Sequence, residues 1–379
     1  MDAVWDREGG RVRLTPAVIV HTEWSDAWGG QELRIIGEAR GVAAHGHRVV
    51  IVARPGAQIL SLAATAGLPT RALQMRQAFD LRAVIGLCRI IRAEHADIVN
   101  THSSVDSWIG AFAAKLTGKK LVRTRHLSKP LSGHVLNFVH RMPDLVITTG
   151  ESIRQQLIEQ TGLKPQVVVS VPTGIDVERF SPQPCASTFK TSLGLPADAR
   201  IVANIAVLRP FKRHDVLVNA AALLRDRLGV HVLIAGEGGQ RPAIEQLVRS
   251  LGLDECVRLL GHVDDVRPLL SCSDVVVLSS GSHEGVSQAL MQALAMARPV
   301  VATDVGATAE LIVHERTGLL VPPNDPAALA MAIERMLREP SFARECGAAG
   351  RQHVVDHYSE GEMIDRVLAL YERLLTKAQ

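Results

Sequence analysis

Residues 274–303, with the sequence DVVVLSSGSHEGVSQALMQALAMARPVVAT, decide the fold. The pattern predicts a strand over 274–278, a polar turn, a helix from about Gly285 to Ala297, and a second strand over 299–303. Both strands are continuous apolar runs without polar alternation, which is typical of parallel strands buried on both faces. A strand, a helix and a strand in this order predict a right-handed βαβ unit.

The same alternation runs through the whole chain of 379 residues, a length that favours two domains. A proline-containing stretch with weak periodicity, 172–196, separates two sets of strands. We therefore predict an α/β protein with two Rossmann-like doubly wound domains, 1–180 and 181–357, facing a central cleft. The final helix, 358–379, could pack on either domain, including back on the first. The predicted strands are 17–21, 48–53, 97–101, 120–124, 144–148, 166–171, 200–207, 230–235, 257–260, 274–278, 299–303 and 318–321.

The charge of the chain is small but unevenly distributed. The net charge is +3, yet basic residues outnumber acidic ones 22 to 16 up to Phe180, and acidic outnumber basic 23 to 20 beyond it. A basic first half suits an anionic substrate or an anionic membrane surface, although uneven surface charge is also common. Nothing in this balance calls for a nucleic-acid partner.

The five cysteines lack the spacing of a metal site and are expected to be free thiols in a reducing cytoplasm. The first residues carry mixed charge without an apolar core, unlike a signal peptide. No apolar run is long enough to span a bilayer. We therefore expect a cytoplasmic protein, either free or in peripheral contact with the inner membrane.

Polar clusters follow several predicted strands, where open α/β sheets bind ligands. Gly29 and Gly30 open a helix whose free N–H groups suit a diphosphate, although a glycine pair there is often only a turn. His102 stands at the end of the strand 97–101. It could bind a substrate oxygen or satisfy a nearby backbone group.

Two further clusters lie in the second half. Arg209 and Lys212 follow the strand 200–207 and suit a phosphate, or form a solvated basic loop. Glu284 is expected near a helix N-terminus, where it could accept hydrogen bonds from sugar hydroxyls or merely cap the helix. Gln288 and Gln292 share one face of that helix, and an amide suits a ribose diol.

Several known motifs are missing from the sequence. No Gly-x-Gly-x-x-Gly opens the first helix, which disfavours a nicotinamide dehydrogenase. The chain also has no Walker A motif, no nucleophile elbow and no Asp-x-Asp pair to hold a metal. No metal or other cofactor is therefore expected.

Taken together, the clusters make the chain resemble the retaining glycosyltransferases of the GT-B fold, family 4. The resemblance spans nearly the whole chain. It rests on the order and spacing of the motifs 29–32, His102, 172–176, 208–212, 235–238, 260–262, 282–285, 293–306 and 317–321.

The resemblance implies roles for these residues. Gly29 and Gly30 would approach the donor diphosphate, and His102 would bind the transferred sugar. Arg209 and Lys212 would neutralise the leaving group, and Glu284 would bind donor-sugar hydroxyls. The remaining donor and nucleotide contacts would come from Gly236, Gly261, His262, His283, Gly285, Val286, Ser287 and Gln292.

The sequence departs from the family pattern at two positions. The second acidic residue of the Glu-x7-Glu pair is replaced by Gln292, and Val207 stands where the family has a basic residue. An amide can still bind a diol, and Arg209 is expected to replace the missing charge. The implied reaction is a front-face transfer with retention, in which the diphosphate helps to deprotonate the acceptor.

Two other functions remain open. A nucleotide-sugar 2-epimerase shares this architecture, and a non-catalytic nucleotide-sugar-binding protein would fit the two departures. The acceptor is expected to be a glycan or lipid-linked glycan of a bacterial lipopolysaccharide or surface-polysaccharide pathway. The candidate acceptor contacts in the first domain are Trp24, Trp28, Arg125 and His126.

Overall fold

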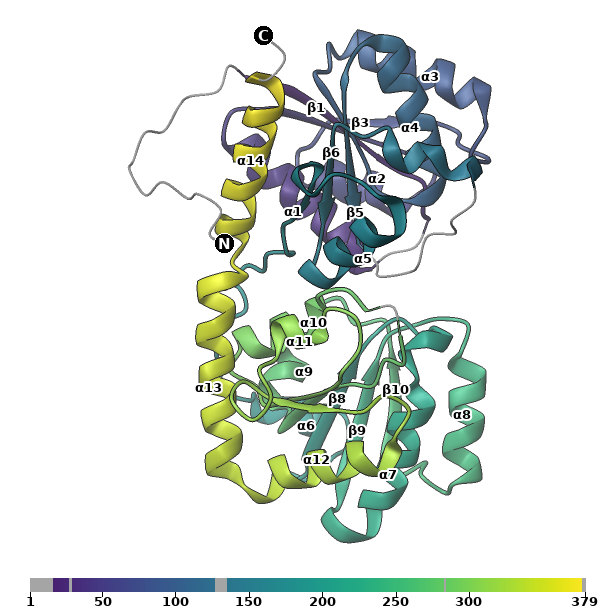
Figure 1. Cartoon of the computed structure of the whole chain (residues 1–379). Helices are drawn as coiled ribbons and strands as arrows, with labels where there is room; N and C mark the ends of the chain where they lie inside the picture. Colours follow the sequence, from purple (N-terminus) through teal and green to yellow (C-terminus); the bar gives the residue numbers. More distant parts are fainter. Residues whose placement is uncertain (1–15, 27–28, 127–134, 283, 377–379) are drawn as a thin grey trace.

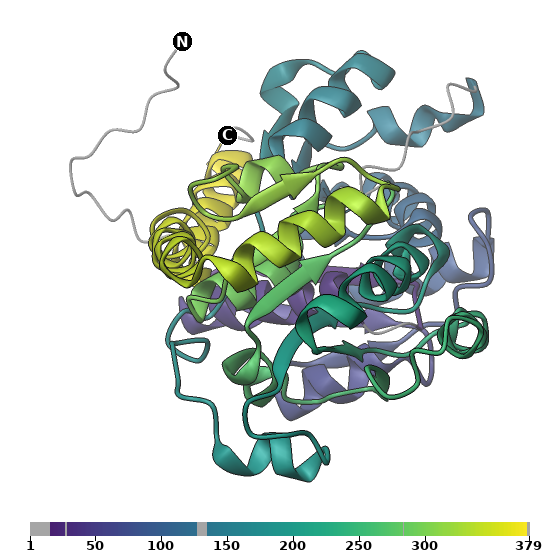
Figure 2. The same cartoon turned by 90° about the horizontal axis from the view of Figure 1, so that it is seen from below.

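The computed structural model describes residues 16–26, 29–126, 135–282 and 284–376, apart from the side chains of 135–137 and 226–227. The chain forms two lobes, one above the other in Figure 1, each with a parallel sheet covered by helices. Figure 2 views the molecule from below, with the second lobe in front. The predicted α/β architecture with two Rossmann-like domains is confirmed.

The first sheet contains seven parallel strands among the described residues, in the order β3-β2-β1-β4-β5-β6-β7. The strands are β1 (Val18–Glu23), β2 (Arg48–Ala53), β3 (Thr70–Ala72), β4 (Ile98–Thr101), β5 (Lys120–Arg125), β6 (Leu145–Thr148) and β7 (Val168–Ser170). The helices are α1 (Gly30–Ala44), α2 (Gln58–Thr65), α3 (Leu81–Ala93), α4 (Ser104–Thr117) and α5 (Glu151–Thr161), with short 3₁₀ turns η1 (Val135–Arg141) and η2 (Pro165–Val167).

The second sheet has six parallel strands in the described chain, in the order β10-β9-β8-β11-β12-β13. The strands are β8 (Arg200–Ile205), β9 (Val230–Ala235), β10 (Val257–Gly261), β11 (Val275–Leu278), β12 (Val300–Thr303) and β13 (Leu319–Val321). The surrounding helices are α6 (Ser187–Ser192), η3 (Pro210–Lys212), α7 (His214–Leu228), α8 (Arg241–Ser250), α9 (Arg267–Cys272), α10 (Gln288–Ala295), α11 (Thr308–Leu311) and α12 (Pro326–Arg338).

Burial explains why continuous apolar runs become strands here. The first sheet separates two apolar layers: side chains such as Ile19 and Ile51 pack on one face, and Val20 and Val50 on the other. The second sheet is covered on both faces in the same way. Each predicted strand was found, with ends shifted by up to two residues. The pattern missed β3, a three-residue edge strand whose side chains are partly or fully exposed.

The C-terminal helices run alongside both lobes (Figure 1). After α13 (Pro340–His357) packs on the second lobe, α14 (Glu360–Thr376) lies against α1 and buries Ile364 and Tyr371 in the first lobe's core. The chain therefore crosses between lobes twice. The two crossings are hydrogen-bonded to each other, because the Ile175 amide donates to the Tyr358 carbonyl over 2.8 Å and the Glu360 amide donates back to Ile175.

One prediction about the cysteines is wrong. Cys185, in the crossing segment before α6, and Cys272, at the end of α9, form a disulfide. Their separation of 87 residues gave no sign of this in the sequence, because tertiary packing alone brings α9 beside α6. Cys88, Cys256 and Cys346 are free thiols.

Candidate active site

The carboxyl ends of the two sheets meet along a surface that we call the interdomain face. There the Gln288 side chain, at the start of α10, donates to the Gly30 carbonyl at the start of α1 over 2.7 Å. The Glu310 carboxylate accepts from the amides of Glu151 and Ser152 at 2.6 and 2.7 Å and so caps α5. These bonds bring the candidate residues of both lobes to one place.

A buried ion pair lies at this face in the second lobe. Lys212 Nζ donates to both carboxylate oxygens of Glu284, at 2.7 and 2.9 Å, and the Ser280 hydroxyl donates to Oε2 over 2.8 Å. The side chains of Lys212 and Glu284 are only 16% and 7% exposed. A carboxylate offers about four lone-pair directions, so Glu284 can still accept further hydrogen bonds.

The backbone around Glu284 differs from the prediction. Helix α10 begins at Gln288, not near Gly285, so Glu284 lies in the loop before it rather than in its first turn. The Ala307 amide donates to the Glu284 carbonyl over 3.1 Å, and a Cβ on Gly306 would come within 2.0 Å of that oxygen. The loop is therefore held by tertiary contacts, which the local helical pattern does not report.

The two glycines at the start of α1 have no packing reason to be glycine. A Cβ on Gly29 would lie 3.7 Å from Glu32, and one on Gly30 would lie 3.7 Å from Gln288, both ordinary contacts. The backbone at Gly29 is extended, with φ −173, which any residue can adopt. An alanine side chain would therefore fit at either position.

Arg209 lies where the second lobe faces α1. Its charge helps to stabilise the ionised form of Glu32, while burial and the charge of Glu23 raise the pKa of Glu32 to about 7. Arg209 itself is exposed. A cation from the second lobe therefore sits near the N-terminus of α1, the end of a helix that favours anions.

The backbone geometry at Gly236 and Gly261 explains why both positions are glycine. Gly236 adopts φ +149, and a Cβ there would come within 1.9 Å of the Ala206 carbonyl oxygen. Gly261 has φ +77, and its carbonyl accepts from the Gly236 amide over 2.7 Å. His262 is exposed beside them and pairs with Asp264 over 3.1 Å. The two glycines shape the ends of β9 and β10, and His262 leaves its ring accessible.

His102 does not present a free ring at the interdomain face. Its Nε2 is 2.8 Å from Nδ1 of His21, and its Nδ1 is 3.0 Å from Nε2 of His126. The residue is 5% exposed. Burial and the two neighbouring imidazoles lower the pKa of His102 well below its ordinary value. Both ring nitrogens that the resemblance assigns to a sugar are therefore occupied by other histidines.

Acidic groups that the sequence reasoning missed lie next to this histidine. Glu23, at the end of β1, accepts hydrogen bonds from Gln31 and Ser103, and burial raises its pKa. Asp106 accepts from the backbone amides of His102 and Ser103, both over 2.8 Å. The spacing of Ser103 and Asp106 is a capping-box signal that the sequence contains, whereas nothing local in the sequence indicates that Glu23 is buried.

Two of the candidate acceptor residues, Trp24 and Arg125, are partly buried in the first lobe. Trp24 donates to the Met75 carbonyl over 3.0 Å, and the guanidinium of Arg54 lies 5.6 Å from the centre of its ring. Arg125 ends β5, and burial lowers its pKa to about 10. Trp28 and His283 lie outside the described residues.

The rest of the predicted donor loop is close to the first lobe. A Cβ on Gly285 would come within 2.6 Å of the His126 carbonyl oxygen, so glycine is needed for this approach. Val286 and Ser287 are buried, and Ser287 is the N-cap residue of α10. Gln292 follows one turn after Gln288 and is half-buried.

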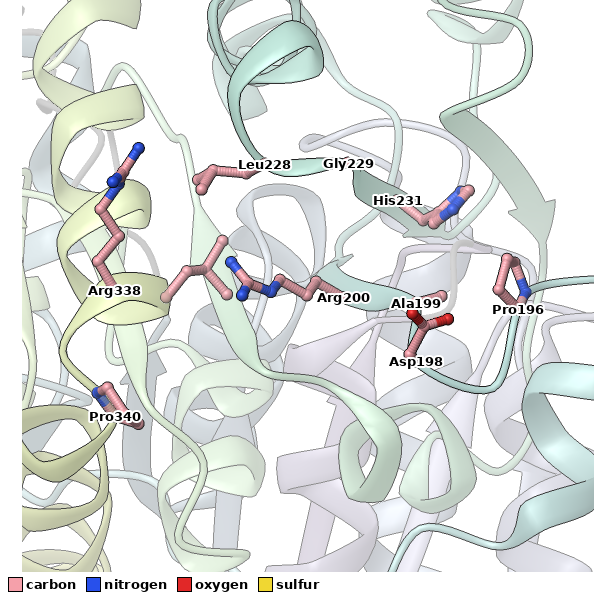
Figure 3. A pocket seen from close by; sticks show the side chains of 10 residues that line it. Pro196, Asp198, Ala199, Arg200, Leu228, Gly229, His231, Arg338 and Pro340 are labelled. Carbon is pink, nitrogen blue, oxygen red and sulfur yellow. The ribbon is translucent and has the colours of Figure 1, made fainter.

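A cavity of about 780 Å³ lies elsewhere in the second lobe (Figure 3). Its lining includes Arg200, Gly229 and His231, which stand at the starts of β8 and β9. The amino ends of parallel strands are opposite the edge that carries Lys212 and Glu284. The Lys212–Glu284 pair and the contacts between the lobes lie at the interdomain face, away from this cavity.

The described residues contain no group of three or more His, Cys, Asp or Glu side chains arranged to hold a metal ion. In the same residues, no helix combines the length and hydropathy required to cross a bilayer.

Comparisons with known proteins identify both halves of the chain. Residues 28–179 match the family model described as Glycosyltransferase Family 4, and residues 199–339 match the model described as Glycosyl transferases group 1. The chain is 29% identical over 314 residues to a D-inositol 3-phosphate glycosyltransferase of Kineococcus radiotolerans, covering 74% of this chain and 72% of that protein. It is 25% identical over 307 residues to an N-acetyl-alpha-D-glucosaminyl L-malate synthase of Bacillus anthracis, covering 78% and 80%.

Solved structures share the fold over nearly the whole length. A glycosyltransferase from Rickettsia africae superposes with a TM-score of 0.87 at 21% identity, over 96% of this chain and 99% of that one. Anabaena HepE in complex with UDP and glucose superposes with a TM-score of 0.85 at 20% identity, over 93% and 99%. At these identities the structures establish the two-domain architecture.

Proposed function

This chain belongs to the group 1 and family 4 glycosyltransferases of the GT-B fold, and we propose that it transfers a sugar from a nucleoside-diphosphate sugar to an acceptor hydroxyl with retention of configuration. The observation that carries this proposal is the buried Lys212–Glu284 pair, which lies at the same interdomain face as the start of α1. A nucleoside-diphosphate sugar carries negative phosphates and several hydroxyl groups. A cation and a helix N-terminus can bind the phosphates, and a carboxylate can accept hydrogen bonds from the hydroxyls.

The leaving group determines where positive charge is useful. When the glycosidic bond to the diphosphate breaks, negative charge grows on the phosphate oxygens. Lys212, Arg209 and the positive end of the α1 dipole would stabilise that charge because they are already in place. These groups supply the positive charge that a divalent cation would otherwise provide, so we propose a metal-independent reaction.

Glu284 would bind the transferred sugar. Its carboxylate keeps acceptor capacity beyond the bonds from Lys212 and Ser280, and sugar hydroxyls are donors. Glycine at 29 and 30 would let backbone approach the diphosphate, since no packing contact requires it. Gln292 and His262 would contact the ribose and the base, and Gly236 and Gly261 shape that end of the site.

No side chain is proposed as a covalent nucleophile. The acceptor would attack from the face that the diphosphate leaves, and a phosphate oxygen would help to remove the acceptor proton. Contacts between the lobes, such as Gln288 with Gly30, would limit the access of water and hence donor hydrolysis.

The acceptor would be anionic. The names of two relatives contain inositol 3-phosphate and malate, which both carry negative charge. In this chain, Arg125 ends β5 and His126 follows it beside the donor loop, and the first half of the sequence carries the basic surplus. We propose a phosphorylated or otherwise acidic glycan of a bacterial surface polysaccharide or lipopolysaccharide, met in the cytoplasm or at the inner membrane surface.

A donor screen tests the proposal. Uridine, guanosine and adenosine diphosphate sugars are added separately, and thermal stabilisation identifies the ligand, since a ligand that binds only the folded state raises its stability. The identified donor is then incubated with glycan acceptors, and the anomer of the product is read by NMR. Glu284→Gln should lose turnover, while Glu345→Gln, an exposed glutamate on α13, serves as the matched control.

The outcomes separate the alternatives. Transfer with retention supports the proposal, and an inverted product refutes the retaining mechanism. Epimerised nucleotide sugar without an acceptor would instead identify a 2-epimerase. Binding without transfer, epimerisation or slow hydrolysis would identify a non-catalytic binding protein.

A further inference from the structure

The carboxylate of Glu310 joins the two lobes by capping a helix that cannot cap itself. Gly150, the N-cap residue of α5, has no side chain that could accept from the helix. The first amides of an α-helix have no partner within the helix. Glu310, in α11 of the second lobe, accepts from two of them, Glu151 and Ser152, at 2.6 and 2.7 Å. A residue of one lobe thus completes a helix of the other.

The glycine at position 150 is required by this close approach. A Cβ there would lie 2.9 Å from the Ala307 Cβ and 3.2 Å from both carboxylate oxygens of Glu310. The backbone at Gly150 is extended, with φ −168, which any residue can adopt. Glycine is therefore needed for the space that α11 occupies and not for its backbone conformation.

The segment that carries Glu310 also holds the proposed donor carboxylate in place. Three residues before Glu310, the Ala307 amide donates to the Glu284 carbonyl over 3.1 Å. Gly306 lies so close to this carbonyl that a Cβ would come within 2.0 Å of its oxygen. The backbone of residues 306–310 thus connects the contact with α5 to the residue that would bind the donor sugar.

The loop before α5 contacts the donor loop as well as α11. A Cβ on Gly285 would lie 3.4 Å from the Thr149 hydroxyl oxygen. That hydroxyl donates to the His126 carbonyl over 3.3 Å, and the same carbonyl oxygen is the atom nearest to Gly285. Residues 149–152 of the first lobe therefore receive both the donor loop and the segment of Glu310.

The backbone of Glu310 is attached to the place where the chain returns to the first lobe. The Tyr358 hydroxyl donates to the Glu310 carbonyl over 2.7 Å. Tyr358 is the C-cap residue of α13, and its own carbonyl accepts from the Ile175 amide of the other crossing segment. The junction of α13 and α14 lies alongside the gap between the lobes in Figure 1. Glu310 is thus held at the crossing by its backbone, while its side chain holds the opposite lobe.

We propose that Glu310 is a positioning residue for the transfer reaction. By capping α5 it keeps the lobes together at the interdomain face, and through Ala307 it fixes Glu284 relative to the start of α1, where the diphosphate binds. Tyr358 orients Glu310 from the crossing. Glu310 does not touch the donor, because its carboxylate is used by the two amides. This inference rests on the proposed function for the identity of the ligand.

Hydrogen exchange tests the cap in the full chain without a ligand. Glu310→Ala removes the acceptor of the Glu151 and Ser152 amides. Their exchange, followed by mass spectrometry of peptides that span 149–155, should become about tenfold faster or more. Glu310→Gln, whose amide oxygen can still accept, should give an intermediate rate. Glu345→Gln, exposed on α13, is the matched control. Unchanged exchange in Glu310→Ala would refute the cap.

Gly150→Ala tests the same contact without removing a polar group. Its methyl group would lie 2.9 Å from the Ala307 Cβ, so α11 has to move away from α5. We expect exchange of the two amides to accelerate as in Glu310→Ala. The matched control is Gly361→Ala, where a Cβ would meet nothing within 4 Å. Parent-like exchange in Gly150→Ala would overturn the proposal that this contact holds the lobes together.

Kinetics then test the positioning role, with UDP-glucose, GDP-mannose and ADP-glucose as the probes. For the donor that is used, Glu310→Ala should lower transfer about 10–100-fold, because a small misplacement of a binding group is costly. The share of donor lost to hydrolysis should rise, since looser lobes admit water. Glu310→Gln should recover part of the transfer. Transfer and hydrolysis that fall in proportion would reflect only a loss of folded enzyme and would refute the positioning role.

The role of Tyr358 has its own test. Tyr358→Phe removes only the hydroxyl that donates to the Glu310 carbonyl. Exchange at the two α5 amides should rise, by less than in Glu310→Ala, and transfer should fall with it. If Tyr358→Phe lowers thermal stability but leaves the exchange of these amides unchanged, Tyr358 does not orient Glu310.

The two proposals fail separately. If none of the three nucleotide sugars binds, the proposed function and the positioning role are both refuted, while hydrogen exchange still decides whether Glu310 caps α5. If a donor is transferred equally well by the parent and by Glu310→Ala, only the present inference is refuted.

Discussion

Removing one member of the buried Lys212–Glu284 pair should be much more costly than removing both. Lys212→Met deletes the cation and leaves the Glu284 carboxylate with the hydrogen bond from the Ser280 hydroxyl. Both partners are mostly enclosed, at 16% and 7% exposure. An uncompensated charge in such a place costs about 2–4 kcal/mol, against 0–1 kcal/mol, roughly, for an exposed pair.

The double variant Lys212→Met with Glu284→Gln has no charge left to solvate. A neutral replacement of a buried pair is often tolerated, so we expect it to recover about 1.5–3 kcal/mol relative to the sum of the single effects. Lys164→Met, at an exposed position, is the matched control and should stay within about 0.5 kcal/mol of the parent.

Urea unfolding can assign the loss to the correct lobe. No tryptophan follows Trp108, so the second lobe contributes no tryptophan fluorescence, whereas circular dichroism reports both lobes. The pair lies in the second lobe, and its loss should shift the circular dichroism transition more than the fluorescence transition. Additive effects of the two substitutions, or a cost of Lys212→Met below about 0.5 kcal/mol, would refute the reasoning.

Three further predictions concern the same face. Gly30→Ala should leave stability within about 0.5 kcal/mol, because its Cβ makes only an ordinary 3.7 Å contact, yet weaken donor binding about tenfold by calorimetry; unchanged affinity would argue against close approach of the diphosphate. Gly236→Ala should cost more than about 2 kcal/mol in urea unfolding, because its Cβ would lie 1.9 Å from the Ala206 oxygen at φ +149. Glu32 has its pKa raised from 4.5 to about 7, so the folded state holds the extra proton and loses stability as pH rises through that window. Glu32→Gln should remove that fall, by up to about 1.4 kcal/mol per pH unit, and an identical pH profile would contradict the assigned pKa.

The fold was largely predictable because its signal is local. Continuous runs of Val, Ile and Leu, such as 275–278, have to be buried on both faces, and the helical patterns between them supply the cover. Asp325 followed by proline is a local helix-start signal of the same kind, and in the structure the Asp325 side chain accepts from two backbone amides at the start of α12. The edge strand β3 was missed since three residues with exposed side chains carry no such signal.

The candidate site was predictable as a set of positions but not as a set of contacts. The ends of parallel strands lie on one edge, so Lys212 and Glu284 could be expected near each other. Nothing local in the sequence reveals that His21 lies beside His102, because the two are 81 residues apart and meet only through the order of the strands. The disulfide between Cys185 and Cys272 was missed for the same reason.

The sequence by itself determined the two α/β domains and the residue types available at the ends of their strands, since burial periodicity and turn chemistry act over a few neighbouring residues. The tertiary structure alone decided how those residues are used. It paired Lys212 with Glu284, enclosed His102 between two histidines, and placed the donor loop against His126. These contacts depend on strand order and on the approach of two lobes, which join residues that are distant along the chain.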